Sequence, residues 1–432
     1  MLRHVARIRI GSGSHRVCAV SRALHADAAS LIELEAKYGA KNYSPLPVVL
    51  ERGEGVHVWD VEGKIYLDFL SAYSAVNQGH AHPKIVGALQ SQAAKLTLTS
   101  RAFHNDILGK YEQRVTSLFG FDRVLPMNTG VEAGETAVKL CRRWGYDVKG
   151  IAPNEAIVLF AENNFWGRSL SACSSSSDPS CRNGFGPFMP GMELIPYNDL
   201  DAFERALERF GQRVAAFMLE PIQGEAGVVV PDDGYLRGVR ELCTKHGVLM
   251  VADEVQTGLG RTGTMLACDH ESVRPDVVVL GKALSGGVYP VSAVLASDEV
   301  MLTIQPGEHG STYGGNPLGC AVAMAALDVL EDEKLAANAA AMGQLLRDRL
   351  REIKVDAITS VRGRGLLNAM VVRPSADGSN ATSLCYALKD AGLLAKPTHD
   401  HIIRLAPPLV INEAQIHEAA DIITREVMAM FA

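Results

Sequence analysis

The chain has 432 residues, of which 47% are hydrophobic and 21% are charged, fractions that exclude a fibrous or largely disordered protein. Its formal net charge of -7 leaves no basic surface for nucleic acid. The longest apolar runs, such as residues 277–280, are far shorter than the ~20 residues of a membrane-spanning helix. We therefore expect a globular protein with no nucleic-acid partner and no membrane partner.

The first thirty residues differ in composition from the rest of the chain. They contain five arginines and four serines, and their one acid is Asp27. A basic segment with serines and almost no acids is typical of a mitochondrial transit peptide, and it lacks the apolar core of a secretory signal. We expect residues 1–30 to be a disordered leader that directs the protein to the mitochondrial matrix. The alternative is a basic tail without a targeting role.

The eight cysteines are scattered, with no C-x-x-C pair among them. Their density is too low for a disulfide framework, which favours a reducing compartment. We expect most of them to be small apolar core residues.

Between residues 76 and 333, apolar runs alternate with amphipathic stretches of helical period. Runs that are apolar throughout indicate strands buried on both faces, as in a parallel sheet covered by helices, and the alternation indicates an α/β fold. The predicted strands are 156–160, 214–219, 248–252, 277–280 and 292–296, and the predicted helices are 132–148, 232–246 and 316–330.

The pattern changes near residue 334. Helices are predicted at 334–353, 382–391 and 412–431, with shorter strands at 357–361, 366–372 and 402–405. This order is typical of a smaller α+β domain, which we expect to span residues 334–432 and to pack with the N-terminal segment 31–75.

Two of the predicted strands end in charged residues. The strand at 248–252 is followed by Asp253, and the strand at 277–280 is followed, one residue later, by Lys282. Alone, the lysine could extend to solvent and the aspartate could cap a helix. Because ligands bind beyond the carboxyl ends of the strands in such sheets, the two charges could share one cleft. Pyridoxal phosphate requires both, a lysine that forms a Schiff base and a carboxylate that keeps the ring nitrogen protonated.

Two polar loops could hold the phosphate of that cofactor. Residues 128–135 lead into a predicted helix, where free N–H groups bind phosphate and Gly130 permits a close approach. Residues 310–316 could donate hydroxyl groups, and residues 164–168 offer two aromatics for ring stacking beside an arginine. A capping loop without a ligand and ordinary core aromatics are the alternative interpretations.

Two other motifs have simpler explanations. Residues 258–263 match G-x-G-x-x-G, but a dinucleotide loop opens a long helix directly after its strand, whereas here we expect extended or irregular chain. His80 and His82 have no acidic or cysteine partner at ligand spacing, so we expect a capping or packing role and predict no metal site.

These blocks resemble the ω-aminotransferases, the class-III group of the fold-type I pyridoxal-phosphate enzymes, and within that group the ornithine aminotransferases. The likeness runs from about Tyr38 to the last helix and leaves out only the leader. The resemblance implies a large cofactor-binding domain at 76–333 with a mostly parallel seven-stranded sheet, and a homodimer or higher oligomer. It is carried by ordered blocks at residues 43–48, 71–80, 128–135, 220–227, 252–258, 281–287 and 310–316.

The resemblance also implies roles around the cofactor. Lys282 would form the Schiff base and carry the proton between substrate and cofactor, and Asp253 would hold the proton of the ring nitrogen. Gln256 would bond the phenolic oxygen, and Phe165 would stack on the ring. The phosphate would be bound by Gly130 and Val131, together with Ser311 and Thr312 of the other subunit.

For the substrates, the resemblance implies that Tyr43 and Arg168 hold the α-amino and α-carboxylate ends of ornithine, while Tyr73 shapes the pocket. The second substrate, 2-oxoglutarate, has two carboxylates and needs a second cation, for which Arg404 is the candidate. During the ornithine half-reaction Arg404 would be an unpaired buried charge, which is costly, so Glu225 is expected to neutralise it. Arginine suits both pairings because it binds carboxylates in bidentate fashion.

The implied reaction transfers the δ-amino group of L-ornithine to 2-oxoglutarate in two half-reactions. The products are glutamate 5-semialdehyde, which cyclises, and glutamate. Freed Lys282 would act as general base and acid, which requires a lowered pKa. Acetylornithine and 4-aminobutyrate aminotransferases share the catalytic residues and are the nearest alternatives. A non-catalytic protein on the same fold is a further alternative, opposed by the presence of both Lys282 and Asp253.

Overall fold

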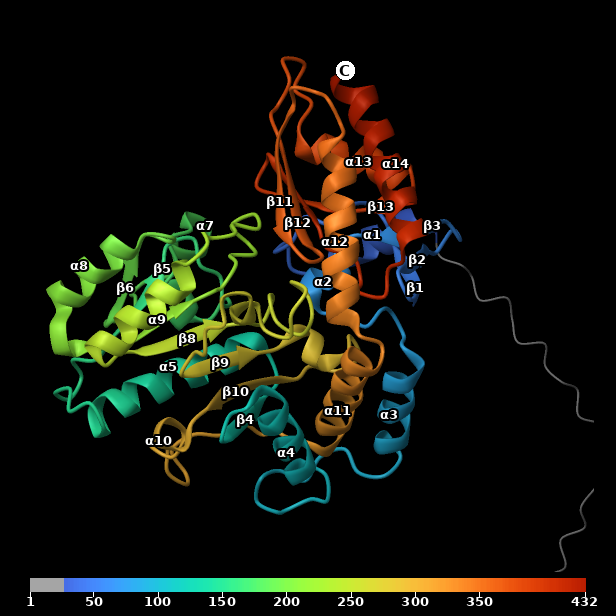
Figure 1. The fold of residues 1–432 in the computed structure, drawn as a ribbon. Coiled ribbons are helices and arrows are strands. Elements are labelled where there is room, and N and C mark those ends of the chain that lie inside the picture. The colour runs from blue at the N-terminus through green and yellow to red at the C-terminus, as the bar shows by residue number, and fades with distance from the viewer. Residues whose placement is uncertain (1–26) are drawn as a thin grey trace, which may run out of the picture.

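The computed structural model describes residues 27–432, and its central element is a seven-stranded sheet in the order β4-β10-β9-β8-β7-β5-β6 (Figure 1). Strands β9, β8, β7, β5 and β6 run parallel, whereas β10 is antiparallel to both β9 and β4. The predicted mostly parallel seven-stranded sheet is therefore confirmed. Its strands are β4 (Arg123–Met127), β5 (Ile157–Ala161), β6 (Met192–Ile195), β7 (Val214–Leu219), β8 (Leu249–Asp253), β9 (Val277–Leu280) and β10 (Ser292–Ala296).

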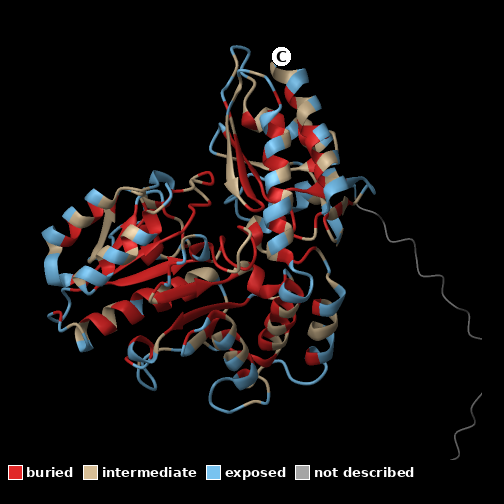
Figure 2. Ribbon diagram, viewed as in Figure 1, coloured by how far each residue is buried: buried red, intermediate tan, exposed pale blue. Residues whose placement is uncertain are grey.

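The strands are apolar on both faces because helices cover both faces of the sheet. In β9, Val277 and Val279 pack in the same core cluster as α5, while Val278 and Leu280 lie in the core of the opposite side with α11. Figure 2 shows the strands buried and the helices exposed on their outer sides. The main covering helices are α3 (Pro83–Ala93), α4 (Leu108–Phe119), α5 (Gly130–Asp147), α8 (Leu200–Phe210), α9 (Tyr235–His246) and α11 (Pro317–Asp332).

The elements predicted for this region are all present. Strands β7, β9 and β10 have the predicted bounds, and β5 and β8 are displaced by one residue. The ends of α5, α9 and α11 differ by at most three residues from the prediction, as is usual for helix termini. The edge strands β4 and β6 were not predicted, because β4 contains Pro126 and β6 is only partly buried and is interrupted by Glu193, so neither is a continuous apolar run.

The C-terminal region forms a second, antiparallel sheet in the order β11-β12-β15-β14. Every helix and strand predicted after residue 334 is present, and β13 and β14 are additional. The elements are α12 (Leu335–Arg351), β11 (Ile358–Arg364), β12 (Leu367–Val372), α13 (Ala381–Asp390), β13 (Leu393–Leu394), β14 (Lys396–Thr398), β15 (Ile402–Leu405) and α14 (Glu413–Phe431).

A third sheet, β1-β2-β3-β13, joins the two ends of the chain. In it Leu67 and Asp68 pair in parallel with Leu393 and Leu394, so the N-terminal strands lie beside the C-terminal helices (Figure 1). The domain limits at residues 75 and 333 stay predictions. The N-terminal elements are α1 (Ala28–Tyr38), β1 (Leu50–Glu54), β2 (His57–Asp60) and β3 (Ile65–Asp68), and the short helices are α2 (Ser71–Ser74), α6 (Leu170–Ser174), α7 (Pro179–Arg182) and α10 (Asp298–Met301).

The predicted leader lies outside the described residues, apart from residues 27–30. There the Asp27 carboxylate accepts a hydrogen bond from the Ser30 amide and caps α1, so helix begins before the predicted limit. All seven cysteines in the described part of the chain are buried, as expected. Among residues 27–432, no helix has both the length and the apolar character needed to cross a membrane.

The G-x-G-x-x-G segment, residues 258–263, forms turns between the large sheet and the C-terminal region. Arg261 within it is fully buried and donates hydrogen bonds to the carbonyls of Leu366 and Pro407, at 3.0 and 2.6 Å, and to Asn77 Oδ1 at 2.6 Å. A Cβ on Gly260 would lie 3.0 Å from Leu409 Cδ1. The glycines therefore permit close packing between distant parts of the chain.

The packing between α12 and the turn before β12 gives a test of the fold. A Cβ on Gly343 would lie 1.7 Å from the Gly365 carbonyl oxygen. Because this oxygen belongs to the main chain, the clash could be relieved only by a shift of the backbone. We expect Gly343→Ala to destabilise the protein by about 4 kcal/mol or more in thermal or denaturant unfolding. The control is Gly87→Ala in α3, where an added Cβ meets nothing within 4 Å. This substitution should stabilise the protein by about 0.5–1 kcal/mol, because alanine favours the helix over glycine. Equal stability of the two variants would contradict this packing.

Candidate active site

Three neighbouring strands place charged side chains around one cavity of about 240 Å³. Glu220 follows β7, Asp253 ends β8, and Lys282 lies two residues after β9. Parallel strands bring these ends together at one edge of the sheet, as the sequence predicted for Asp253 and Lys282. The remaining lining residues are Gly130, Val131, Phe165, Trp166, Gly167, Val255 and Gln256.

Lys282 starts a short 3-10 helix, and its φ of 42° is a left-handed conformation that non-glycine residues seldom adopt. Such strain is found at functional sites, where the surrounding structure enforces it. Burial lowers the pKa of Lys282; the Glu225 carboxylate opposes this shift and the Arg404 charge adds to it. A lysine that readily loses its proton is a better nucleophile and proton acceptor.

Asp253 is 5% exposed and accepts a hydrogen bond from the Val255 amide at 3.0 Å. Burial raises its pKa to about 6, although the Val255 amide and the Lys282 charge lower it. A cationic ring nitrogen beside this carboxylate would stabilise its ionised form. The environment of Asp253 therefore fits a protonated pyridine ring.

The N-terminus of α5 forms one wall of the cavity. Thr129 and Glu132 cap the helix reciprocally, with the Thr129 amide donating to the Glu132 carboxylate at 2.7 Å. The amides of Gly130 and Val131, in the first turn, remain for a ligand. A Cβ on Gly130 would lie 3.1 Å from Val255 Cγ1, so a side chain there would crowd the cradle. Helix start, free amides and glycine together fit a phosphate group.

The two aromatic residues of the predicted stacking segment have different environments. Trp166 is fixed in the core, where its ring stacks on Phe160 at 5.8 Å and its Nε1 donates to Ser175 Oγ at 2.8 Å. Phe165 is only partly buried and lines the cavity, with the exposed Arg168 guanidinium 5.6 Å from its ring centre. Phe165 is therefore the residue available to a flat ligand.

Arg404 and Glu225 form a bidentate ion pair beside this cavity. The two guanidinium nitrogens of Arg404, which is 1% exposed, donate to the two Glu225 oxygens at 2.8 and 2.9 Å. Gln256 bridges them: its Oε1 accepts from Arg404 at 2.9 Å and its Nε2 donates to Glu225 at 3.2 Å. Burial would raise the pKa of Glu225, but Arg404 lowers it to about 2. The bond of Gln256 to a cofactor oxygen stays a prediction.

Tyr73 reaches Arg404 from a left-handed turn in α2. The residues Ser71 to Ser74 have φ values of 50°, 46°, 59° and 72°, and none of these four residues is a glycine. Asp68 Oδ1 accepts from the Leu70 and Ser71 amides at 2.8 and 2.9 Å, which holds the turn at its start. The Arg404 guanidinium lies 5.0 Å from the Tyr73 ring centre, a cation–π contact.

The two histidines of the sequence motif have the expected structural roles. His80 Nε2 bonds Asp68 Oδ2 at 2.7 Å and so supports the residue that holds the left-handed turn. His82 caps α3 and pairs with Glu333 at 2.8 Å. Among residues 27–432 there is no group of three potential metal ligands.

Seven of the predicted residues do not line the Lys282 cavity: Tyr73, Arg168, Glu225 and Arg404, and also Tyr43, Ser311 and Thr312. Tyr43 is 79% exposed, in the segment before β1. Ser311 Oγ accepts from Asn128 Nδ2 at 2.9 Å, and Ser311 and Thr312 line a separate hollow along α5 with Val131. Within one chain they do not line the Lys282 cavity, and their expected action on a second subunit stays a prediction.

Two residues of the site, Thr398 and Glu220, were not predicted from the sequence. Thr398 Oγ1 accepts from Arg404 at 3.1 Å, a contact between adjacent strands of the C-terminal sheet that no sequence spacing indicates. Glu220 could have been found, because it follows an apolar strand as Asp253 and Lys282 do.

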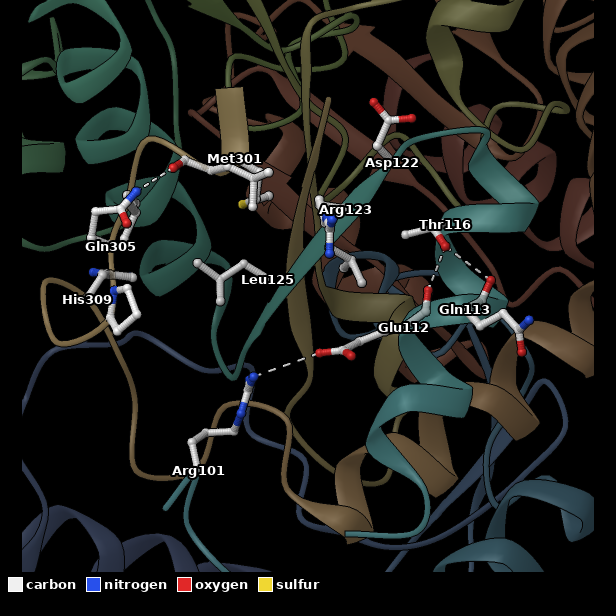
Figure 3. A pocket seen from close by; sticks show the side chains of 14 residues that line it. Arg101, Glu112, Gln113, Thr116, Asp122, Arg123, Leu125, Met301, Gln305 and His309 are labelled. Carbon is white, nitrogen blue, oxygen red and sulfur yellow. Dashed lines mark hydrogen bonds and ion pairs between the residues drawn. The ribbon is translucent and has the colours of Figure 1, made fainter. Parts of the chain in front are cut away.

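A larger cavity, of about 830 Å³, lies elsewhere, between α4, β4 and the chain after α10 (Figure 3). Its walls carry both signs of charge, and Arg101 and Glu112 approach each other at 3.9 Å across it. None of the predicted site residues lines it. Size alone therefore does not identify the site in this protein.

The fold and the chemistry of the Lys282 cavity define an enzyme class, the aminotransferases that use pyridoxal phosphate. Residues 38–427 match the family model of the class-III aminotransferases, and the chain belongs to that family. Class-III aminotransferases use pyridoxal phosphate.

Three relatives illustrate the likeness. The chain is 65% identical to the mitochondrial ornithine aminotransferase of Rattus norvegicus over 399 residues, 92% of this chain and 90% of that one. An ornithine aminotransferase structure from Toxoplasma gondii, described as having partial occupancy of PLP at its active site, is 49% identical with a TM-score of 0.91, covering 94% and 95% of the two chains. The acetylornithine aminotransferase structure from Elizabethkingia anophelis is 58% identical with a TM-score of 0.86, covering 94% and 100%.

The raised pKa of Asp253 predicts opposite effects of Asp253→Asn with and without cofactor. A carboxyl whose pKa is raised by folding destabilises the fold as the pH rises from about 4 towards its folded pKa of about 6. Cofactor-free Asp253→Asn should therefore be more stable than wild type at pH 8, by about 1–3 kcal/mol, and no more stable near pH 4. The cofactor-bound variant should instead lose cofactor at least tenfold more readily on dialysis. Thermal unfolding of cofactor-free wild type and Asp253→Asn at the two pH values measures their difference in stability. An equal difference at both pH values would contradict the raised pKa of Asp253.

Proposed function

We propose that this protein transfers the δ-amino group of L-ornithine to 2-oxoglutarate in two half-reactions, with glutamate 5-semialdehyde and glutamate as products. The semialdehyde would then cyclise to pyrroline-5-carboxylate. The observation that carries this proposal is the bidentate pairing of the buried Arg404 with Glu225 near Lys282. The similar proteins named as ornithine aminotransferases support the same substrate.

The pair explains how one site could accept two different acids. Ornithine has one carboxylate, and Arg168 is the cation expected to bind it, so Arg404 is best neutralised by Glu225. 2-Oxoglutarate has two carboxylates, and displacement of Glu225 would free Arg404 for the second. The bidentate geometry and the low pKa of Glu225 support a pair that is fully charged at neutral pH.

The residues around the cavity would hold the cofactor in defined ways. Gly130 and Val131 would donate amide N–H groups to its phosphate, Phe165 would lie against its ring, and Asp253 would keep the ring nitrogen protonated. Lys282 Nζ would form the covalent link. When bound, pyridoxal phosphate supplies a carbonyl carbon that binds amines and a ring that withdraws electrons from the neighbouring carbon.

Lys282 would move the proton in each half-reaction. Its lowered pKa supports a neutral amine that can take a proton from the δ-carbon of ornithine and return it to the cofactor. Burial of the cavity limits water near the reacting atoms. Tyr73, held over Arg404, would close the substrate side of the pocket.

The nearest alternative substrate is acetylornithine. The 58% identical relative with that name shares the fold, so the fold does not separate the two activities. A non-catalytic role is disfavoured by the environments of Lys282 and Asp253.

We also propose a homodimer or higher homo-oligomer in the mitochondrial matrix. Ser311 and Thr312 lie at the surface outside the Lys282 cavity, where they could serve a second subunit. The basic composition of residues 1–30 and the mitochondrial names of several relatives support the location.

The reaction is tested by a substrate panel of ornithine, acetylornithine, 4-aminobutyrate and lysine with 2-oxoglutarate. Wild type should prefer ornithine, and Lys282→Ala should lose multiple turnover while retaining its fold, because the covalent link and the proton carrier are both gone. Far-UV circular dichroism checks the fold of the variant. A preference of the wild type for acetylornithine would show that ornithine is not the substrate. Sustained turnover by Lys282→Ala would show that Lys282 is not required for the reaction.

The pairing of Arg404 is tested by Glu225→Ala. Loss of the carboxylate should expose Arg404, favour glutamate in the pocket and slow reaction with ornithine. We expect the ratio of the two half-reactions to change on the order of tenfold for each ~1.4 kcal/mol of altered pairing. Single-turnover absorbance changes with ornithine and with glutamate measure the ratio, and Glu225→Gln, which keeps the shape, should fall between. Equal slowing of both half-reactions would make Glu225 a structural residue.

The leader is tested separately from the chemistry. A fusion of residues 1–30 to a fluorescent reporter should enter mitochondria, because a basic, acid-poor segment is drawn in by the membrane potential. Replacement of its five arginines by glutamine is the matched control and should leave the reporter in the cytosol. If the wild-type fusion stayed in the cytosol, the proposed mitochondrial location would be wrong, but the proposed reaction would be unaffected.

A further inference from the structure

Glu220 lies in the wall of the Lys282 cavity, but the proposed reaction gives it no role. It follows β7 directly and is 5% exposed. Burial of a carboxylate is costly unless hydrogen bonds or opposite charges compensate for the lost water. The groups that compensate here are main-chain amides, and they come from two different loops.

Each carboxylate oxygen of Glu220 binds one loop. Oε1 accepts from the Phe165 amide at 2.9 Å, and Oε2 accepts from the Gly224 amide at 3.1 Å. The first loop follows β5 and presents the Phe165 ring to the cavity. The second loop carries Glu225, the partner of Arg404, directly after Gly224. One buried side chain therefore connects the residue beside the cofactor ring to the residue that neutralises the substrate-binding arginine.

A second contact strengthens this connection. Gln223 Nε2, in the second loop, donates to the Glu162 carbonyl of the first loop at 2.7 Å. The second loop is also packed tightly against Gln256, since a Cβ on Gly224 would lie 2.2 Å from Gln256 Oε1. The same amide oxygen accepts from Arg404, so a displacement of Gly224 would be transmitted to the ion pair.

We propose that Glu220 is a positioning residue that fixes Phe165 and the Glu225–Arg404 pair relative to each other. It acts through the amides of Phe165 and Gly224. The consequence for catalysis rests on the proposed function: loosening of this clamp would weaken the discrimination between ornithine and glutamate. The clamp itself is a property of the fold.

The charges near Glu220 indicate how the clamp responds to cofactor. Burial, and then the Asp253 charge, raise the pKa of Glu220 to about 8, while the two amides lower it. Only the ionised carboxylate has both oxygens fully available as acceptors. A cation bound beside Asp253 would offset the repulsion, so the clamp should be tighter in the cofactor-bound protein.

Hydrogen exchange followed by mass spectrometry tests the clamp directly. In the cofactor-bound enzyme, Glu220→Gln replaces one acceptor oxygen with an NH2 group, which cannot accept a hydrogen bond from a main-chain amide. The remaining oxygen can then bind only one of the two loops at a time. Exchange in peptides covering residues 162–168 and residues 221–227 should rise about tenfold in both, as expected when a hydrogen bond to a charged group is lost. Glu220→Asp, too short to span both loops, should give the same pattern.

The matched control is Glu254→Gln. Glu254 is also a buried carboxylate beside Asp253, but it accepts from the Cys268 amide at 2.9 Å and from the Thr257 hydroxyl, outside the two loops. Its substitution should leave exchange in residues 162–168 and 221–227 unchanged. Faster exchange in both segments for Glu220→Gln, but not for Glu254→Gln, supports the clamp. Exchange that is unchanged in either segment of the Glu220 variants overturns it.

A double-variant cycle tests the catalytic consequence. Glu220→Asp should shift the ratio of single-turnover rates towards glutamate at least fivefold relative to ornithine. In the Glu225→Ala background the same substitution should leave the ratio within twofold, because no ion pair remains to be positioned. An unchanged ratio in the single variant, or a full shift in the double variant, overturns the positioning role. If wild type does not react with ornithine, the proposed function fails, while the exchange measurement still decides whether Glu220 joins the two loops.

Discussion

The guanidinium of Arg404 is almost completely removed from water, and the structure beside the Lys282 cavity depends on how that charge is balanced. Burial of a cation is costly unless a carboxylate and hydrogen bonds replace its hydration. Glu225, Gln256 and Thr398 provide this replacement, and they surround the guanidinium from separate segments of the chain. Glu225 lies beside the cavity, where the proposed function requires a ligand carboxylate to take its place. Under the proposed function, Arg404 would be neutralised while ornithine is bound and would bind the second carboxylate of 2-oxoglutarate afterwards.

The central sheet supplies the opposite half of the site. Strands β7, β8 and β9 end in two carboxylates and a lysine, and burial alters the pKa of all three side chains. Both acids are raised and the amine is lowered, so each group is held nearer its neutral form than in water. A bound ring cation would reverse part of this cost. The arrangement is thus less stable alone than with the cofactor that the family uses, which links cofactor retention to the electrostatics of the strand ends.

The sequence predicted the elements of the large sheet well, because buried parallel strands leave long apolar runs. Charged residues directly after those runs located Lys282 and Asp253, and the same rule could have located Glu220. Other features have no local signal. Arg404 and Glu225 are separated by 178 intervening residues and meet only through tertiary packing, so only the resemblance to a family paired them. Strand β13 has two residues, too few for any period, and its pairing with β3 depends on the fold around it.

The left-handed turn at residues 71–74 has a further consequence for how this pocket can change. Each non-glycine residue in that conformation costs about 1–2 kcal/mol, and Asp68, supported by His80, helps to offset the cost. Tyr73 is therefore held over Arg404 by residues that do not line the pocket themselves. A substitution at Asp68 could relax the turn and move Tyr73 relative to Arg404 although both residues stayed the same. Under the proposed role of Tyr73 in shaping the substrate pocket, a substitution outside the pocket could thus change the substrate preference of this enzyme.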